Sequence, residues 1–254
     1  MSQMIALITG ASSGIGEAFA KKFAQQGYNL VITGRREDLL HDISDKLQKR
    51  YNIIVETLKV ELADEEDLEF LSEKIKHMDN LSVLVNNAGF GSRFNFINEE
   101  FKSQEDMIKV HVLAPVKLIY AALPGMIHRG HGTIINVSSI SGKTPLPVGA
   151  TYSATKSFLS TFSESLYLEN ASTNIKIQTL CPGFTKTNFH GKLGLNGASL
   201  SNKGFIRWMT PERVVEVSLK NLKKGKIICV PGFWNKVIWF LADIIPRNIY
   251  YKII

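Results

Sequence analysis

Tyr152 and Lys156 are the two side chains whose types and spacing best suit acid–base chemistry. They stand four residues apart, and positions i and i+4 of a helix share one face, so a phenol and an ammonium would lie side by side. An isolated tyrosine has a pKa of about 10, and a fixed positive charge nearby favours the phenolate and lowers that pKa. Such a tyrosine can exchange protons with a substrate, while the upstream hydroxyl of Ser139 could hold the substrate oxygen.

The residues before this pair predict how it is positioned. The apolar run over 133–137 is typical of a buried strand, and a loop rich in Gly and Pro connects it to a helix that runs to Glu169. The segment 139–156 therefore places Ser139 at the end of a strand and the tyrosine and lysine on the following helix.

A glycine-rich turn near the N-terminus predicts a nucleotide site. It follows an apolar run over 4–9 and precedes helical spacing over 17–26. Glycines there let backbone N–H groups approach a pyrophosphate at the positive end of the helix. Strand, turn and helix in this order favour a dinucleotide-binding unit over a tight turn that holds no ligand. The candidate contacts are Gly10, Ser12, Ser13, Gly14, Ile15 and Gly16.

Two arginines follow the second expected strand, which covers 28–34. NAD-specific units usually place an acidic residue there, on the ribose 2′-hydroxyl. In this chain Gly34 takes that place and Arg35 and Arg36 come next. Guanidinium groups pair with a phosphate, so we expect them to bind the 2′-phosphate of NADP(H), with help from Ser12. The alternative is that they only begin a solvated helix over 37–50.

Further candidate contacts follow the third expected strand, over 53–60. The carboxylate of Glu61, next to Leu62, could accept a hydrogen bond from an adenine amino group. Equally, it could only cap the amphipathic helix expected over 64–78.

The fourth expected strand, over 81–85, ends in Asn86, Asn87, Ala88 and Gly89. Asparagine side chains there can tie adjacent strands together, and the small Ala-Gly backbone leaves room for a ribose. We therefore expect this turn to lie against the cofactor.

His111 lies in a long helical pattern over 101–128 that Pro115 should kink near the histidine. It has two interpretations: a histidine packed inside a kinked helix, or a relay group that faces the active site. The residues around it do not decide between them.

The loop after the sixth expected strand, 175–180, carries Pro182, Gly183, Thr185 and Thr187, and its polar groups could hold a carboxamide. The residues that follow, 188–209, mix glycines with large apolar side chains. This composition favours a substrate lid over an ordinary surface loop.

The C-terminal tail, 233–254, follows a helix over 211–223 and a strand over 226–230. It is apolar, contains scattered basic residues and is broken by Asp243 and Pro246. We expect it to pack on the domain or on a second subunit. A helix lying on a membrane surface is the alternative.

The composition excludes several other classes of protein. The 254 residues are 44% hydrophobic and 21% charged, typical of a globular domain, and the net charge of +7 is spread without a Lys/Arg block, which disfavours nucleic acid. Cys181 and Cys229 are expected to be buried, reduced thiols, and no cluster has metal-ligand spacing. We find no signal peptide and no apolar run of about 18 residues, so we expect a cytoplasmic protein.

Strand patterns alternate with helical patterns seven times along the chain. This order predicts an α/β fold: one doubly wound Rossmann-type parallel sheet of about seven strands flanked by helices, in a single domain over 1–254. All the motifs above fall at the carboxyl ends of the expected strands, where such folds bind ligands, so we expect one site.

Over nearly its whole length the chain resembles the short-chain dehydrogenase/reductase family. The resemblance rests on the turn 9–16, on 86–89, Ser139 and 152–156, and on Pro182-Gly183. It implies that Ser139 orients the substrate oxygen and that Tyr152 is the acid/base. It also implies that Lys156 binds the nicotinamide ribose and lowers the tyrosine pKa.

The resemblance implies further that Thr185 and Thr187 match the carboxamide-binding positions and that Arg35 marks the NADP-preferring members. It implies a homo-oligomer, either a dimer or a tetramer. Two positions depart from the family pattern. Glu61 replaces an Asp, and His111 replaces the Asn that anchors a proton-relay water. A neutral imidazole can donate and accept, so it could take the place of the Asn, whereas a protonated one would add positive charge beside Lys156. We expect His111 to keep activity but to change the pH profile.

The expected function is hydride transfer between NADP(H) and a carbonyl or alcohol, with a substrate that is hydrophobic if 188–209 forms a lid. A non-catalytic NADP-binding regulator on the same scaffold is the alternative. A membrane-surface protein that acts on a lipid is the third.

Overall fold

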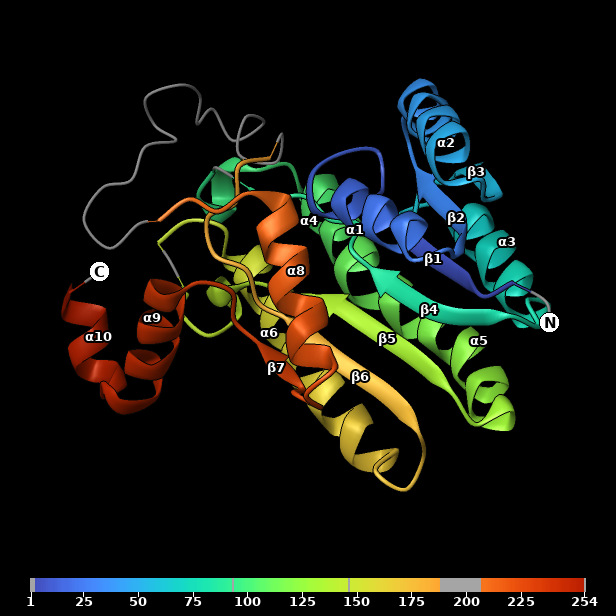
Figure 1. Ribbon diagram of the computed structural model, residues 1–254. Coiled ribbons are helices and arrows are strands. Elements are labelled where there is room, and N and C mark those ends of the chain that lie inside the picture. Colours follow the sequence, from blue (N-terminus) through green and yellow to red (C-terminus); the bar gives the residue numbers. More distant parts are fainter. Residues whose placement is uncertain (1–2, 93, 146, 188–206, 254) are drawn as a thin grey trace.

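The computed structural model describes residues 3–92, 94–145, 147–187 and 207–253. Seven parallel strands form one sheet in the order β3-β2-β1-β4-β5-β6-β7, which confirms the predicted fold (Figure 1). The strands are β1 (Ile5–Thr9), β2 (Asn29–Gly34), β3 (Val55–Lys59), β4 (Leu81–Asn86), β5 (Gly132–Val137), β6 (Ile175–Leu180) and β7 (Ile228–Cys229).

Helices cover both faces of the sheet. One face carries α1 (Gly14–Gln25), α2 (Glu37–Tyr51) and α8 (Pro211–Leu222). The other carries α3 (Glu65–Lys76), α5 (Ala114–Arg129) and α6 (Ala150–Glu169). The remaining helices are α4 (Phe101–Ile108), η1 (Phe96–Asn98), η2 (Lys109–Leu113), η3 (Ile140–Gly142), α9 (Phe233–Ile244) and α10 (Arg247–Ile253).

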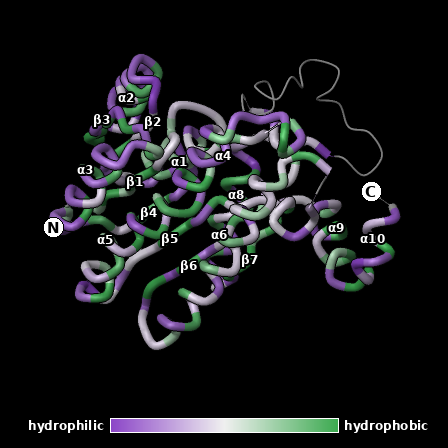
Figure 2. Tube along the Cα trace, turned by 180° about the vertical axis from the view of Figure 1, so that it is seen from behind, coloured by the Kyte–Doolittle hydropathy of each residue, from purple (hydrophilic) through white to green (hydrophobic). Residues whose placement is uncertain are grey.

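The strands are continuous apolar runs because successive side chains point to opposite, covered faces. In β1, Ala6 and Ile8 pack with α1, α2 and α8, whereas Leu7 packs with α3, α5 and α6. The same hydropathy pattern is visible in Figure 2, where the central strands are hydrophobic and the surrounding helices carry most of the hydrophilic residues. Burial of these runs fixes the sheet and, with it, the loops at the carboxyl ends of its strands.

The long helical pattern over 101–128 is interrupted as predicted. The π-helical turn η2 (Lys109–Leu113) separates α4 from α5, and Pro115 lies directly after it. A proline has no backbone N–H to donate to the carbonyl four residues earlier, which here belongs to His111. The helix widens at this point, and π-helical turns of this kind are common at functional sites.

Candidate active site

The candidate site lies where the strand order reverses, between β1 and β4. Crossovers leave β1 and β4 in opposite directions along the sheet, so their carboxyl-end loops separate and leave a crevice. Gly10 follows β1, Asn87 follows β4 and Ser139 follows β5. Three sequence-distant motifs therefore meet at one edge of the sheet, as predicted.

The glycine turn is packed too closely for larger side chains. Gly10 has a φ of +66°, and a Cβ atom on it would lie 2.7 Å from the Cα of Ala88. A Cβ on Gly16 would lie 2.4 Å from the carbonyl oxygen of Gly10. The Asn87 side chain locks the turn, because its Nδ2 donates to the carbonyl oxygens of Thr9 and Gly10 at 2.9 and 3.0 Å.

Asparagine side chains tie the strands together, as the sequence suggested. The Nδ2 of Asn86 donates to the Oδ1 of Asn136 at 2.8 Å, which joins β4 to β5. The Nδ2 of Asn136 donates to the Oγ of Ser163 at 2.9 Å, which joins β5 to α6. All three side chains are buried, so this chain of bonds fixes the catalytic helix against the sheet.

The two arginines are placed differently from each other. The Nη2 of Arg36 donates to the Oγ atoms of Ser12 and Ser13 at 2.9 and 3.0 Å, so its guanidinium lies against the glycine turn. The Nη1 of Arg35 lies 3.3 Å from the Oε2 of Glu61, and both side chains are largely exposed. Both guanidinium groups thus border the carboxyl end of β2.

Glu61 also supports the start of α3. Its Oε1 accepts a hydrogen bond from the N–H of Ala63 at 3.3 Å, and its own N–H donates to Asp67 at 2.7 Å. The N-cap of α3 is Asp64, which accepts from the N–H of Asp67. The buried Leu62 follows Glu61 in the turn. Glu61 therefore has a structural role at the start of α3. The adenine contact that the sequence suggested stays a prediction.

The three catalytic candidates come together between β5 and α6. Ser139 is the N-cap of η3, and its Oγ accepts from the N–H of Ser141 at 3.1 Å. Lys156 is buried, and its Nζ donates to the carbonyl oxygen of Val137 at 2.9 Å and lies 5.8 Å from the centre of the Tyr152 ring. Side chains at positions 152 and 156 of α6 therefore share a face, as predicted.

The expected lowering of the tyrosine pKa is wrong for this structure. Burial raises the pKa of Tyr152 above its usual value of 10.0, and only the hydrogen bond with Ser139 acts in the other direction. Burial also lowers the pKa of Lys156 to about 8 from 10.5. Loss of solvent is the largest effect on the tyrosine pKa, and the ammonium of Lys156 is directed at the carbonyl oxygen of Val137.

His111 is a fully packed side chain with a partner on each ring nitrogen. Its Nε2 lies 3.1 Å from the N–H of Phe90, which donates to it, and its Nδ1 lies 3.0 Å from the Oγ1 of Thr155. Because Nε2 accepts, Nδ1 carries the proton and donates to Thr155, whose own hydroxyl donates to the carbonyl oxygen of Tyr152 at 2.9 Å. His111 thereby connects the loop after β4 to the helix that carries the tyrosine.

Of the two charge states considered for His111, the protonated one does not fit this structure. Burial, and next the charge of Lys156, hold the pKa of His111 well below 6.5. The imidazole is therefore neutral at neutral pH and adds no charge beside the lysine. Gly89 is required here, since a Cβ on it would lie 2.8 Å from the Nε2 of His111.

The loop after β6 closes over the glycine turn. Pro182 accepts from the N–H of Ile140, the hydroxyl of Thr185 donates to Gly183, and Gly14 lies so close that a Cβ on it would be 2.9 Å from the Cγ2 of Thr187. The predicted carboxamide-binding residues are thus brought beside the glycine turn. Of the predicted lid, 188–206 lies outside the described residues.

Sequence reasoning missed several residues that hold the site together. Thr155, Asn136 and Ser163 all make buried side-chain hydrogen bonds between elements. Asn235 of the tail packs so closely on Gly183 that a Cβ there would lie 2.4 Å from its Oδ1. Thr155 lies within the recognised segment 152–156, but nothing in its spacing indicates that it bonds to a histidine on another helix.

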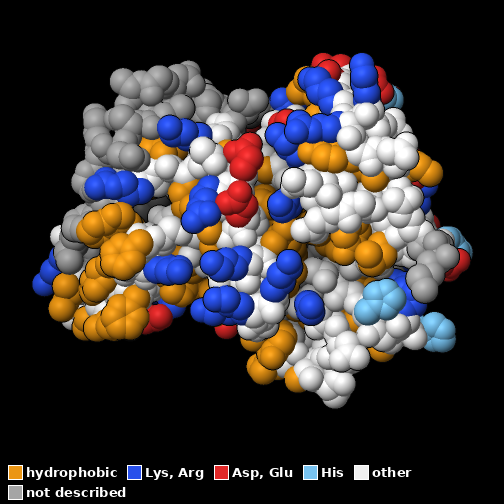
Figure 3. All heavy atoms as spheres, in the orientation of Figure 1, with side chains coloured by type: hydrophobic (Ala, Val, Ile, Leu, Met, Phe, Trp, Pro, Cys, Tyr) orange, Lys and Arg blue, Asp and Glu red, His pale blue; other side chains and the backbone are white. Residues whose placement is uncertain are grey.

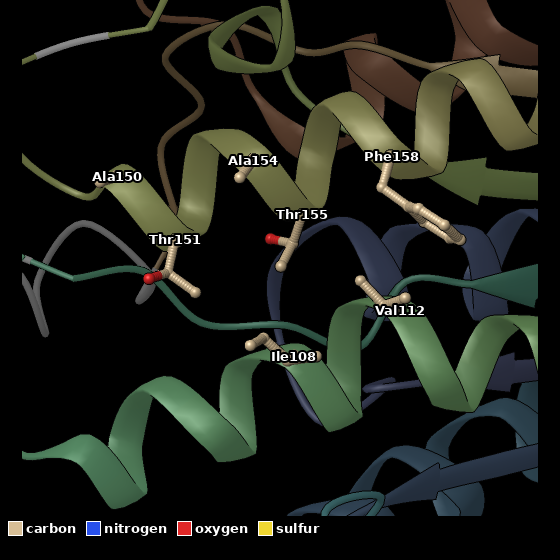
Figure 4. A pocket seen from close by; sticks show the side chains of 7 residues that line it. All are labelled: Ile108, Val112, Ala150, Thr151, Ala154, Thr155 and Phe158. Carbon is tan, nitrogen blue, oxygen red and sulfur yellow. The ribbon is translucent and has the colours of Figure 1, made fainter.

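An apolar groove of about 450 Å³ lies between α4 and α6, away from the catalytic side chains (Figure 4). Ile108 and Val112 face Thr151, Thr155 and Phe158 across it. Ser139, Tyr152 and Lys156 do not line it, so the groove is separate from the acid–base site.

The fold and this arrangement define a Rossmann-type α/β protein in which Ser139, Tyr152 and Lys156 are acid–base candidates at the carboxyl edge of the sheet. Comparison with known proteins agrees: residues 4–196 match the family model described as short chain dehydrogenase. The chain is 31% identical to the human very-long-chain 3-oxoacyl-CoA reductase over 98% of this chain and 78% of that protein. It is 33% identical to an NADP-dependent 3-hydroxy acid dehydrogenase of Shigella flexneri, over 84% and 86% of the two chains.

A solved short-chain dehydrogenase from Sphingobium yanoikuyae, in complex with NADPH, superposes with a TM-score of 0.87 at 27% identity, covering 97% of this chain and 94% of that one. The protein belongs to the short chain dehydrogenase family and is an oxidoreductase.

Proposed function

We propose that this enzyme transfers a hydride between NADP(H) and the carbonyl or alcohol group of a hydrophobic substrate. The observation that carries the proposal is the meeting of Ser139, Tyr152 and Lys156 at the carboxyl edge of the sheet, beside the glycine turn. The names of the relatives support a 3-oxoacyl or 3-hydroxyacyl group as the reacting class.

The residues around the turn fit a dinucleotide. Among the described residues no side chain caps the N-terminus of α1, so its first N–H groups are available for a pyrophosphate. A Cβ at Gly10 or Gly16 would meet protein atoms, so only glycine lets the turn pack this closely in front of the helix N-terminus. Lys156 would hold the ribose near the nicotinamide, and Thr185 and Thr187 the carboxamide. When bound, the cofactor supplies or accepts the hydride.

The protein's own residues would manage the proton and the charge. The high pKa of Tyr152 keeps its phenol protonated, ready to donate to the carbonyl oxygen during reduction. Ser139 would donate a hydrogen bond to the same oxygen as negative charge develops on it. A protonated Lys156 would then stabilise the phenolate that remains. The test is NADPH oxidation with a panel of ketones and 3-oxoacyl thioesters of increasing chain length, run in parallel with NADH.

Replacing both arginines, Arg35→Ala/Arg36→Ala, should raise the KM for NADPH by about tenfold to a hundredfold, because charge-assisted hydrogen bonds to a phosphate contribute about 1.5–3 kcal/mol. The KM for NADH should change less than about twofold, since NADH has no 2′-phosphate. Lys46→Ala/Lys49→Ala on α2 removes the same charge and is the matched control. Equal losses with both cofactors, or an equal loss in the control, would contradict the proposed role.

We propose that His111 positions the catalytic helix and does not relay protons. His111→Leu should lower kcat by about tenfold, because the Phe90 N–H would lose its acceptor, at a cost of about 1–3 kcal/mol, and the Thr155 hydroxyl would keep only its bond to Tyr152. His111→Asn, which retains a donor and an acceptor, should restore most of the activity.

The pH–rate curve separates the two roles of His111. With a neutral imidazole the wild-type curve should have the same shape as that of His111→Asn between about pH 5.5 and 7.5. An inflection in this range that disappears in His111→Asn would show that His111 titrates and would rule out the positioning role.

We propose a homo-oligomer as the working form. The apolar groove between α4 and α6 is lined by the exposed side chains of Ile108 and Phe158, and Phe101 at the start of α4 is also exposed, which supports a contact between copies there. Sedimentation velocity of wild type and of Phe101→Ser/Phe158→Ser measures whether these substitutions convert the oligomer into a monomer.

A further inference from the structure

The C-terminal tail forms two short helices, α9 and α10, and we call them the C-terminal hairpin (residues 233–252). Its inner face is attached to the domain. The buried Asn235 donates to the carbonyl oxygen of Pro231 at 2.7 Å, and Trp239 packs against Ile140, Cys181 and Val230. One face of α9 therefore packs on the domain.

The outer face of the hairpin is apolar and exposed. Phe233, Phe240 and Ile244 are spaced by about two and one helical turns on one side of α9 and are 72, 61 and 58% exposed. Leu241 on α9 and Ile249 and Tyr251 on α10 extend the same exposed set. Figure 3 shows hydrophobic side chains gathered at the end of the molecule where α9 and α10 lie. We call this set the hairpin patch.

Positive charge surrounds the hairpin patch. Lys236, Arg247 and Lys252 lie on the hairpin, and Figure 3 shows further Lys and Arg side chains beside it. The hairpin carries one acid, Asp243, whose Oδ2 lies 2.5 Å from the Nζ of Lys143. This acid is already paired within the chain, so the charge offered to a partner is positive.

The hairpin is held in one orientation relative to the active site. The hydroxyl of Tyr250 donates to the carbonyl oxygen of Pro145 at 2.7 Å, and Arg247 donates to that of Lys143 at 3.4 Å. The Nζ of Lys143 also lies 4.5 Å above the ring of Trp239. Lys143 and Pro145 belong to the loop between Ser139 and Tyr152. A surface that receives the hairpin patch would therefore lie beside the loop that frames the acid–base site.

We propose that the hairpin patch docks the enzyme on an anionic lipid bilayer, with α9 and α10 lying in the plane of the interface. Apolar side chains enter the boundary of the acyl chains while the surrounding cations meet the lipid headgroups. This interaction is separate from the reaction proposed above, and its readout is binding rather than turnover.

Charge favours a bilayer over a second copy of the chain. A two-fold contact through the hairpin patch would place Lys236, Arg247 and Lys252 near their own copies, with Asp243 already paired. Like charges at such a contact repel, whereas anionic headgroups neutralise them.

The contact is with the surface of the bilayer. Within the described residues one helix, Phe101–Arg129, is long and apolar enough to cross a membrane by length and composition, which the sequence reading had not found. Half of its apolar window is buried, and α5 packs on β4, β5 and α3 as a core helix of the domain. It therefore supplies no membrane contact, and the hairpin patch does.

The test is co-sedimentation of the full-length protein with vesicles of phosphatidylcholine, with and without phosphatidylglycerol. Wild type should bind the anionic vesicles, bind pure phosphatidylcholine less, and be partly released at high salt. Phe240→Ser/Ile244→Ser should lower the ratio of bound to free protein at least about tenfold, because two apolar side chains that enter the bilayer are lost. Lys236→Glu/Lys252→Glu should remove the preference for the anionic lipid.

The matched control is Ile54→Ser/Phe70→Ser. These two side chains are 67 and 54% exposed, close to the values for Phe240 and Ile244. They lie near β3 and α3, at the opposite end of the sheet from the hairpin (Figure 1). This variant should bind vesicles as wild type does, and circular dichroism should show that all variants are folded.

Three results would overturn the proposal. Wild type that does not sediment with anionic vesicles rules out the bilayer as partner. Equal losses in Phe240→Ser/Ile244→Ser and in the control show that general surface hydrophobicity, not the hairpin patch, causes binding. Wild type that binds no vesicles, but changes its sedimentation coefficient when Phe240 and Ile244 are replaced, identifies the patch as a contact between copies.

Discussion

Tyr152→Phe is expected to lower kcat for carbonyl reduction by about a thousandfold, because a positioned general acid contributes about 10²–10⁴-fold. The substitution removes one oxygen atom and leaves the half-buried ring in place on α6. The affinity for NADPH should change little, since the glycine turn and the arginines are untouched. Steady-state kinetics with NADPH and the best ketone of the panel, together with titration of NADPH binding, measure both effects.

Tyr167→Phe is the control for this substitution, because Tyr167 lies near the C-terminal end of the same helix and packs against the core. It should keep wild-type kcat. Activity of Tyr152→Phe within about tenfold of wild type would show that another group, such as Ser139, supplies the proton, and the proposed mechanism would be wrong.

Lys156→Met is expected to stabilise the protein at neutral pH while it removes activity. The pKa of Lys156 is lowered from 10.5 to about 8, and each pKa unit corresponds to about 1.4 kcal/mol, so the buried charge costs about 3 kcal/mol. The substitution also leaves the carbonyl oxygen of Val137 without its donor, which destabilises the variant by about 1–3 kcal/mol. The net stabilisation at neutral pH should be about 1 kcal/mol, from a residue that the reaction requires.

The dependence on pH is the sharper part of this prediction. Below about pH 8, Lys156 is protonated in both the folded and the unfolded state, so the difference between wild type and Lys156→Met is constant. Between about 8 and 10.5 the folded protein has lost the proton and the unfolded chain has not, so the unfolded state binds more protons and wild type gains stability as pH rises.

Urea unfolding of both proteins measures this gain, because effects of other titrating groups cancel in the difference. Wild type should gain about 2 kcal/mol relative to Lys156→Met between about pH 7 and about pH 9.5. A difference that does not change over this range would show that Lys156 keeps an ordinary pKa in the folded protein.

The fold was predictable because local pattern and tertiary packing agree at nearly every strand. A run such as Ala6-Leu7-Ile8 has no polar face, so the strand that it forms must be covered by helices on both faces of the sheet. The seventh strand was the least well predicted. It covers only Ile228–Cys229 because its partner β6 pairs with it through Thr179 and Leu180 alone. Pairing with a neighbour sets the ends of a strand, and hydropathy alone does not show it.

Placement of the site residues was also predictable, but their electrostatics were not. Residue spacing puts Tyr152 and Lys156 on one face of a helix whatever surrounds them. A pKa depends on how much solvent each group has lost, and that loss comes from residues remote in the sequence. The charge of Lys156 alone favours a lowered pKa for Tyr152, whereas burial of the phenol raises it.

His111 illustrates the same division. The sequence shows that His111 replaces the asparagine of the family pattern. Its partners, Phe90 and Thr155, lie 21 and 44 residues away in the sequence. Only the folded chain shows that both ring nitrogens are occupied and that the imidazole is neutral.

By itself the sequence determined the doubly wound sheet, the glycine turn and the acid–base pair, because each follows from periodicity and spacing over a few residues. The tertiary structure alone decided the ionisation of Tyr152, Lys156 and His111 and the outward orientation of Phe240 and Ile244. These properties depend on which surfaces lose water when distant segments pack, and no local pattern records that loss.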